Sequence, residues 1–157
     1  MDPSQLRDVG TAALWGGTFV FALVSGVVPW VLNIEVYLIA VATLTDASPV
    51  AIVGLSTAGQ SLAKYILYLV GKGSLNISWI KRSASSKAAE AFTKRPGSGT
   101  AIVAVSSVTG FPPLYGVALI AGALRLPVVS YLVAITLGRI VRFGACYLAP
   151  DYLKQLW

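Results

Sequence analysis

Residues 9–34, VGTAALWGGTFVFALVSGVVPWVLNI, form a run of 26 residues without a charged side chain. About 20 apolar residues are enough for a helix to cross a bilayer. Trp15 and Trp30 lie toward the two ends of the run, where indole rings favour the membrane–water interface. This stretch predicts a transmembrane helix and therefore an integral membrane protein.

The composition of the whole chain agrees with this prediction. Of 157 residues, 56 % are hydrophobic and only 11 % are charged, whereas soluble proteins carry about 25 % charged residues. The chain has no His and a single Cys, Cys146, so zinc sites, haem ligation and His-dependent nucleophilic catalysis are excluded within one chain. We expect no metal, no cofactor, no nucleic-acid binding and no enzymatic activity.

Two later apolar runs, 49–71 and 127–149, are also long enough to cross the membrane. Three others are about half that length: 35–45, 100–108 and 114–124. Short apolar helices broken by Gly and Pro, in matching positions of two halves, are typical of re-entrant hairpins around a transporter site. Pairs of tilted crossings are the alternative. The predicted hairpin breaks are Pro49, Gly110, Pro112 and Pro113.

The two halves of the chain match at an offset of 78 residues. At this offset Tyr37 aligns with Tyr115, Ala40 with Ala118, Pro49 with Pro127, Lys64 with Arg142 and Tyr65 with Phe143. The coincidence of prolines and intramembrane cations indicates an internal repeat, which is inverted if an odd number of crossings separates the halves. The predicted fold is a single all-α membrane domain over residues 1–157. It consists of a small helical bundle with two re-entrant, broken-helix hairpins in an inverted repeat, with halves at 11–71 and 100–150.

The connection at 72–99 is strongly basic, with six Lys and Arg residues against one acid, Glu90. Apolar residues at helical spacing, among them Trp79, Ala84 and Phe92, predict a basic amphipathic surface helix. The positive-inside rule places it on the cytoplasmic side, where it would rest on anionic headgroups. Setting the topology and recognising a substrate are alternative roles. We expect a bacterial or archaeal cytoplasmic membrane, and a homo-oligomer is compatible with the sequence.

Three cations lie within the predicted spans: Lys64, Arg139 and Arg142. Each would cost about 2.5–3.5 kcal/mol if it faced lipid, so they are expected to face the interior of the bundle. Arg125 ends a short segment and is a fourth candidate. A guanidinium pair suits phosphate oxygens, and these four cations predict a site for a lipid phosphate. The alternative is that they snorkel to the interface or form structural ion pairs.

Glu35 and Asp46, at the two ends of the first short segment, are the acids available to these cations. They are predicted to balance the charge or to carry a coupling proton. If both pair with cations, two positive charges remain without an acid. This excess favours an anionic ligand.

Three groups of residues give the chain a resemblance to the DedA superfamily, also called the SNARE-associated or VTT-domain family. They are Glu35 before a Pro-containing break, Gly54–Gly59 with Lys64-Tyr65 and Gly71-Lys72-Gly73, and Gly110-Phe-Pro-Pro113 with Ala121-Gly122, Gly138-Arg139 and Arg142-Phe143. The usual bacterial pattern also has an Arg on each side of the Pro in the second hairpin, and residues 106–113 have neither.

This resemblance implies two facing re-entrant hairpins and movement of lipids across the bilayer. Its bacterial members are associated with undecaprenyl phosphate recycling or phosphatidylethanolamine flipping, and its eukaryotic relatives with lipid scrambling. The expected function is therefore a flippase- or scramblase-like transporter of a phosphate-bearing lipid. A non-transporting scaffold or assembly factor that docks anionic lipid or a protein partner is the alternative.

Overall fold

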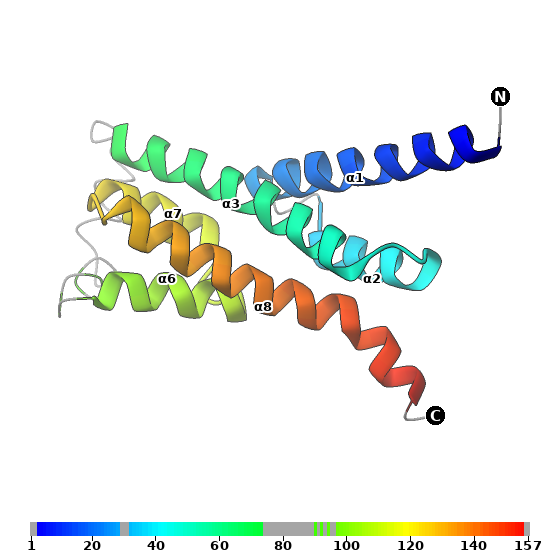
Figure 1. Ribbon diagram of the computed structural model, residues 1–157. Helices are drawn as coiled ribbons and strands as arrows, with labels where there is room; N and C mark the ends of the chain where they lie inside the picture. The colour runs from blue at the N-terminus through cyan, green and yellow to red at the C-terminus, as the bar shows by residue number, and fades with distance from the viewer. Residues whose placement is uncertain are drawn as a thin grey trace.

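The computed structural model describes residues 3–28, 32–73 and 97–155, together with the single positions 90, 92 and 94. Within these residues the chain is helical and contains no strand (Figure 1). The six helices are α1 (Pro3–Val27), α2 (Ile34–Leu44), α3 (Pro49–Gly73), α6 (Ser98–Thr109), α7 (Leu114–Ala123) and α8 (Val128–Gln155). The order of long and short helices is the same as the order of long and short apolar runs in the sequence.

Three of the helices, α1, α3 and α8, are long and apolar enough to cross a membrane. The expectation of one helix over residues 9–34 was wrong, because α1 ends at Val27 and α2 begins at Ile34. Pro29 explains the early end, since a proline disfavours helical backbone at the residue before it. The second predicted interface anchor, Trp30, lies outside the described residues, as does most of the predicted basic helix at 72–99.

The predicted breaks coincide with helix ends. Pro49 is the first residue of α3, a position where its missing N–H costs nothing. Gly110 follows the last residue of α6 with φ 80°, a left-handed conformation that glycine adopts without steric penalty. Pro112 follows a cis peptide bond, and Pro113 caps α7.

The first two helices of each half form an antiparallel pair. Thr18 Oγ1 of α1 and Tyr37 Oη of α2 lie 2.7 Å apart, and the rings of Phe21 and Tyr37 stack with centroids 4.6 Å apart. In Figure 1, α7 likewise returns from the centre of the molecule toward the end at which α6 begins. The end of α1 and the start of α2 lie near the centre, as does the turn between α6 and α7, and the pairs open toward opposite ends (Figure 1).

The long helices α3 and α8 run side by side in opposite directions (Figure 1). Tyr131 Oη of α8 donates a hydrogen bond of 2.8 Å to the carbonyl of Lys64. The hydroxyls of Ser61 and Thr136 lie 3.3 Å apart. This contact between α3 and α8 forms the axis of the bundle.

The short helices exchange partners between the halves. Helix α1 packs on α3 and α6 on α8, but α2 packs on α8 and α7 on α3. Two tyrosines reproduce this exchange, because Tyr68 Oη of α3 donates to the carbonyl of Leu126, just before α8, and Tyr147 Oη of α8 donates to the carbonyl of Ala47, just before α3. Each half therefore anchors the start of the other half's long helix.

Candidate functional site

Four of the predicted charged residues, Glu35, Lys64, Arg139 and Arg142, come together in the central part of the bundle. We call them the charged cluster. Glu35 lies in the first turn of α2, Lys64 in α3, and the two arginines lie one turn apart in α8. All four line two cavities of about 290 Å³ and about 240 Å³. The larger is the first cavity and the smaller is the second cavity.

Arg142 forms an ion pair with Glu35. Its Nε and Nη2 atoms both lie 2.6 Å from Glu35 Oε1. Asn33 caps α2 and accepts a hydrogen bond of 2.9 Å from the backbone N–H of Glu35, which fixes the start of this helix. Arg142 Nη1 also donates to the carbonyl of Val108, at 3.0 Å. One guanidinium thus joins α8 to the start of α2 and to the end of α6.

Lys64 makes the equivalent contact in the first half. Its side chain is only 2 % exposed, and Nζ donates a hydrogen bond of 2.5 Å to the carbonyl of Gly26. Gly26 and Val108 are each the penultimate residue of their helix, and such carbonyls have no partner within the helix. The aligned cations Lys64 and Arg142 therefore bind matching carbonyls in the two halves.

Arg139 is buried without an acidic partner in the part of the chain that the structure describes. The residue is 8 % exposed, and its Cζ atom lies 5.2 Å from the ring centroid of Phe143, a favourable cation–π arrangement. Its Nε atom has no hydrogen-bond partner among the described residues. With one acid and three cations, the charged cluster has a formal excess of two positive charges.

The two cavities differ in the rest of their lining. The first cavity is bordered by Gly110, Pro113, Leu114 and Tyr115, and most of its wall is apolar. The second is bordered by Ser25, Asn33 and Gln60, and most of its wall is polar. The charged cluster thus borders both a mostly apolar space and a mostly polar one.

Gln60 is the functional candidate that sequence analysis missed. It is 2 % exposed and donates a hydrogen bond of 2.8 Å from Nε2 to Ser25 Oγ, yet its Oε1 atom has no partner among the described residues. A buried amide inside an apolar helix resembles an ordinary interhelical contact. The available signal was its position one turn before Lys64 on the same face of α3.

The structure separates two predicted residues from the charged cluster. Asp46 follows α2 and lines another pocket, with Thr43, Pro49 and Tyr147. Eleven residues of helix lie between the start of α2 and the loop that holds Asp46, which at 1.5 Å per residue amounts to roughly 16 Å. Arg125 is exposed in the turn between α7 and α8, at φ 53°, and lines neither cavity of the cluster.

No group of three or more His, Cys, Asp or Glu side chains gathers as a metal site within the described ranges. Comparison of the chain with protein-family models, curated proteins and solved structures gives no match. The function of the charged cluster is therefore inferred from its geometry and charge.

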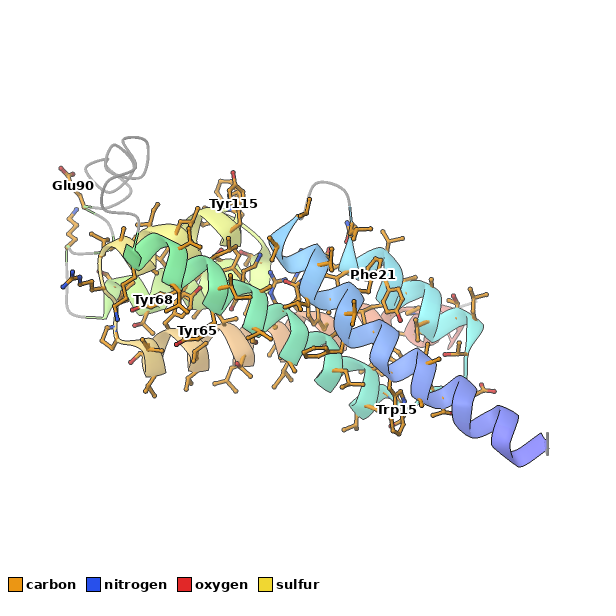
Figure 2. The ribbon with its side chains drawn as sticks, turned by 90° about the horizontal axis from the view of Figure 1, so that it is seen from above. Trp15, Phe21, Tyr65, Tyr68, Glu90 and Tyr115 are labelled. Carbon is orange, nitrogen blue, oxygen red and sulfur yellow. The ribbon has the colours of Figure 1, made fainter. Side chains whose placement is uncertain are left out.

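Figure 2 shows the molecule from above with its side chains. Trp15 and Phe21 lie on α1, and Tyr65 and Tyr68 lie on α3, away from the outer end of α1. Tyr65 and Tyr68 stack with ring centroids 6.4 Å apart, and Tyr68 also packs on Tyr131 at 4.8 Å. These aromatic contacts join α3 to α8 just after Lys64, where Tyr131 also donates to the lysine carbonyl.

Proposed function

We propose that this protein moves a phosphate-bearing lipid across the bilayer and that the charged cluster holds the phosphate during the movement. The observation that carries the proposal is the excess of two positive charges between two cavities in the membrane-spanning part of the chain. Guanidinium groups match phosphate oxygens in shape and charge. An anion is the ligand that such a site favours.

The position of the cations supports a role in transport. Lys64 and Arg142 lie near the middle of α3 and α8, where charged side chains are costly and generally serve a function. Since the wall of the first cavity is mostly apolar, it suits the hydrocarbon part of a ligand. A phosphorylated lipid combines both chemistries, whereas a water-soluble anion does not.

We further propose that α1–α2 and α6–α7 are re-entrant hairpins and that the two halves form an inverted repeat. Three observations support this: the exchange of short helices between the halves, the reciprocal tyrosine hydrogen bonds, and the matching carbonyl contacts of Lys64 and Arg142. In transporters, inverted repeats allow a central site to face each side of the membrane in turn.

This architecture is also the one implied by the resemblance to the DedA superfamily, and we propose membership as a short, divergent member. The corresponding location is a prokaryotic cytoplasmic membrane, with residues 72–99 on the cytoplasmic side. The activity would be transport without chemical change of the lipid, so the protein would not be an enzyme.

Glu35 has a specific part in this proposal. Both close contacts of its Oε1 atom are to Arg142, and an arriving phosphate would compete for the same guanidinium. Release of Glu35 from Arg142 would leave a carboxylate able to accept a proton. Lipid binding and proton uptake would then be linked through one ion pair.

Reconstitution in liposomes tests the proposed function. Transbilayer movement of fluorescent phospholipid and of polyprenyl phosphate is measured with and without a pH gradient, for the parent protein and for Arg139→Ala/Arg142→Ala. Since the double substitution removes both guanidinium groups, we expect movement to fall to the rate of empty liposomes. Lys72→Ala removes a cation that lines neither cavity and should leave the rate unchanged.

Each outcome has a definite meaning. If the double variant is monodisperse and still moves lipid at the parent rate, the charged cluster does not hold the phosphate. If folded parent protein moves neither lipid, the transport proposal is wrong and a scaffold that docks anionic lipid becomes the better explanation.

A further inference from the structure

We infer that the second cavity binds the headgroup beyond the phosphate, and that this headgroup is uncharged and carries hydroxyl groups. The ligand would then be a phosphodiester lipid of the phosphatidylglycerol type. The inference rests on the proposed function, because it assumes that the phosphate lies at the charged cluster. It adds the chemical class of the headgroup and assigns Gln60 to its recognition.

The amide of Gln60 has a defined orientation. Ser25 Oγ donates its own proton to the carbonyl of Ala22, at 3.0 Å. The serine can therefore only accept from Gln60, so Nε2 points to Ser25 and Oε1 is the free end of the amide. Gln60 Oε1 is thus a buried acceptor without a donor among the described residues, in a side chain that lines the second cavity.

Arg139 supplies the opposite chemistry to the same cavity. Its Nε atom is a buried donor without an acceptor among the described residues. Leaving a buried polar atom unpaired generally costs about 1–3 kcal/mol, so a ligand that pairs with both atoms is favoured. A hydroxyl group both donates and accepts a proton. Hydroxyl groups can therefore pair with both kinds of atom, the acceptor Gln60 Oε1 and the donor Arg139 Nε.

Charge excludes the other common kind of headgroup. The second cavity is lined by Lys64, Arg139 and Arg142 against the single acid Glu35. An ammonium group would be repelled by this excess, and because it cannot accept a hydrogen bond it would leave Arg139 Nε unpaired. The cavity therefore favours a glycerol-like or sugar-like headgroup over an ethanolamine or choline headgroup.

The test compares lipids that share one phosphodiester charge. Equilibrium binding of dioctanoyl phosphatidylglycerol, phosphatidylmethanol and phosphatidylethanolamine is measured on the purified full chain in detergent. Phosphatidylmethanol carries the same charge as phosphatidylglycerol but has no headgroup hydroxyl. We expect phosphatidylglycerol to bind about five- to tenfold more tightly than phosphatidylmethanol, the effect of one or two hydrogen bonds. Phosphatidylethanolamine should bind more weakly than phosphatidylglycerol.

Gln60→Met keeps a similar side-chain length and removes the amide. It should weaken phosphatidylglycerol binding to the level of phosphatidylmethanol and leave phosphatidylmethanol binding unchanged. Thr57→Val is the matched control, because Thr57 is also buried on α3 with an unpaired oxygen but lines neither cavity of the charged cluster. Thr57→Val should keep the preference for phosphatidylglycerol.

The outcomes separate this inference from the proposed function. Equal binding of phosphatidylglycerol and phosphatidylmethanol by the parent protein, or tighter binding of phosphatidylethanolamine, overturns the headgroup assignment and leaves the phosphate site standing. If Gln60→Met weakens both anionic lipids equally, Gln60 only supports the fold. If none of the three lipids binds, the headgroup inference is overturned and the charged cluster holds no phosphodiester; movement of polyprenyl phosphate in the liposome assay then decides whether it holds a phosphomonoester.

Discussion

Gly110 illustrates how one residue serves both the backbone and the charged cluster. Its φ of 80° lies in the left-handed region, and a Cβ atom added there would lie 2.6 Å from Arg142 Nη1. A side chain at this position would therefore strain the turn and displace the guanidinium that pairs with Glu35. Glycine at the turn keeps the ion pair in place.

Gly110→Ala should consequently lower both stability and lipid movement. The left-handed backbone alone costs an alanine about 1–2 kcal/mol, and displacement of Arg142 adds a loss of transport. Gly97→Ala separates the two effects, because Gly97 has φ 83° but no atom within 4 Å of the added Cβ. Thermal unfolding in detergent should show a loss for both variants, and liposome assays a loss for Gly110→Ala alone. Normal transport by Gly110→Ala would contradict this account of Arg142.

The cations of the charged cluster could be identified from the sequence more readily than their partners. Lys64 and Arg142 were predictable because a charge within an apolar run has to face the interior of the bundle. Gln60 was not, because its proposed role depends on the proton of Ser25 and on a cavity lined by residues of α1, α2, α3 and α8. Asp46 was misjudged because the length of α2 separates it from Glu35.

Helix α8 depends on close packing at Gly138. A Cβ atom added at Gly138 would overlap the side chain of Ser107 in α6. Ser107 is itself fixed, since its single hydroxyl proton is shared between a carbonyl on α6 and a carbonyl on α8. The contact between α6 and α8 therefore requires glycine at this position.

Gly138→Ala should destabilise the protein by about 1–3 kcal/mol, the usual cost of overpacking, and should do so despite the better helix propensity of alanine. Gly144→Ala, in the same helix, meets no atom within 4 Å and should instead stabilise by up to about 1 kcal/mol. Thermal unfolding of both variants in one detergent measures the difference. Equal effects would mean that α6 does not pack on α8 at Ser107.

The short helices themselves were predictable from the Gly and Pro residues that interrupt the apolar runs. Pro49 marks the junction between α2 and α3, and Gly110 with Pro112 and Pro113 marks the junction between α6 and α7. The end of α1 was missed. The run stays uncharged and largely apolar through Ile34. Its polarity therefore does not mark the end of the helix that Pro29 causes.

For the molecule as a whole, the structure predicts which segments share a side of the membrane. Figure 1 shows that α1 begins, and α8 ends, at the same end of the bundle as the α2–α3 junction. The turn between α7 and α8 lies at the opposite end. Since this turn carries Arg125 and lies next to the end of α3 that carries Lys72, the positive-inside rule favours that end as cytoplasmic.

Cysteine labelling checks this topology. In a Cys146→Ser background, Asp46→Cys should react with a membrane-impermeant maleimide from outside the cell, and Arg125→Cys only after the membrane is permeabilised. Both positions are exposed in the structure. Labelling of both from one side would contradict the opposite courses of α3 and α8 across the membrane, and a reversed pattern would contradict only the sidedness.

The exchange of partners between halves could not be predicted from the sequence. Offsets and apolar periods show that the halves match, but they do not show on which long helix a short helix packs. The ion pair between Glu35 and Arg142 decides this for α2, because it joins residues 107 positions apart. A pair so far apart in the sequence cannot be recognised from the spacing of neighbouring residues.

This separation also determines the order in which the protein can assemble during its synthesis. When a ribosome has completed α2, the helix on which α2 packs does not yet exist, and Glu35 has no arginine to neutralise it. Without a cationic partner, the carboxylate of Glu35 on this 11-residue helix favours the polar headgroup region over the hydrocarbon core of the membrane. We therefore expect α2 to remain near the membrane surface until α8, the last of the described helices to be translated, provides Arg142.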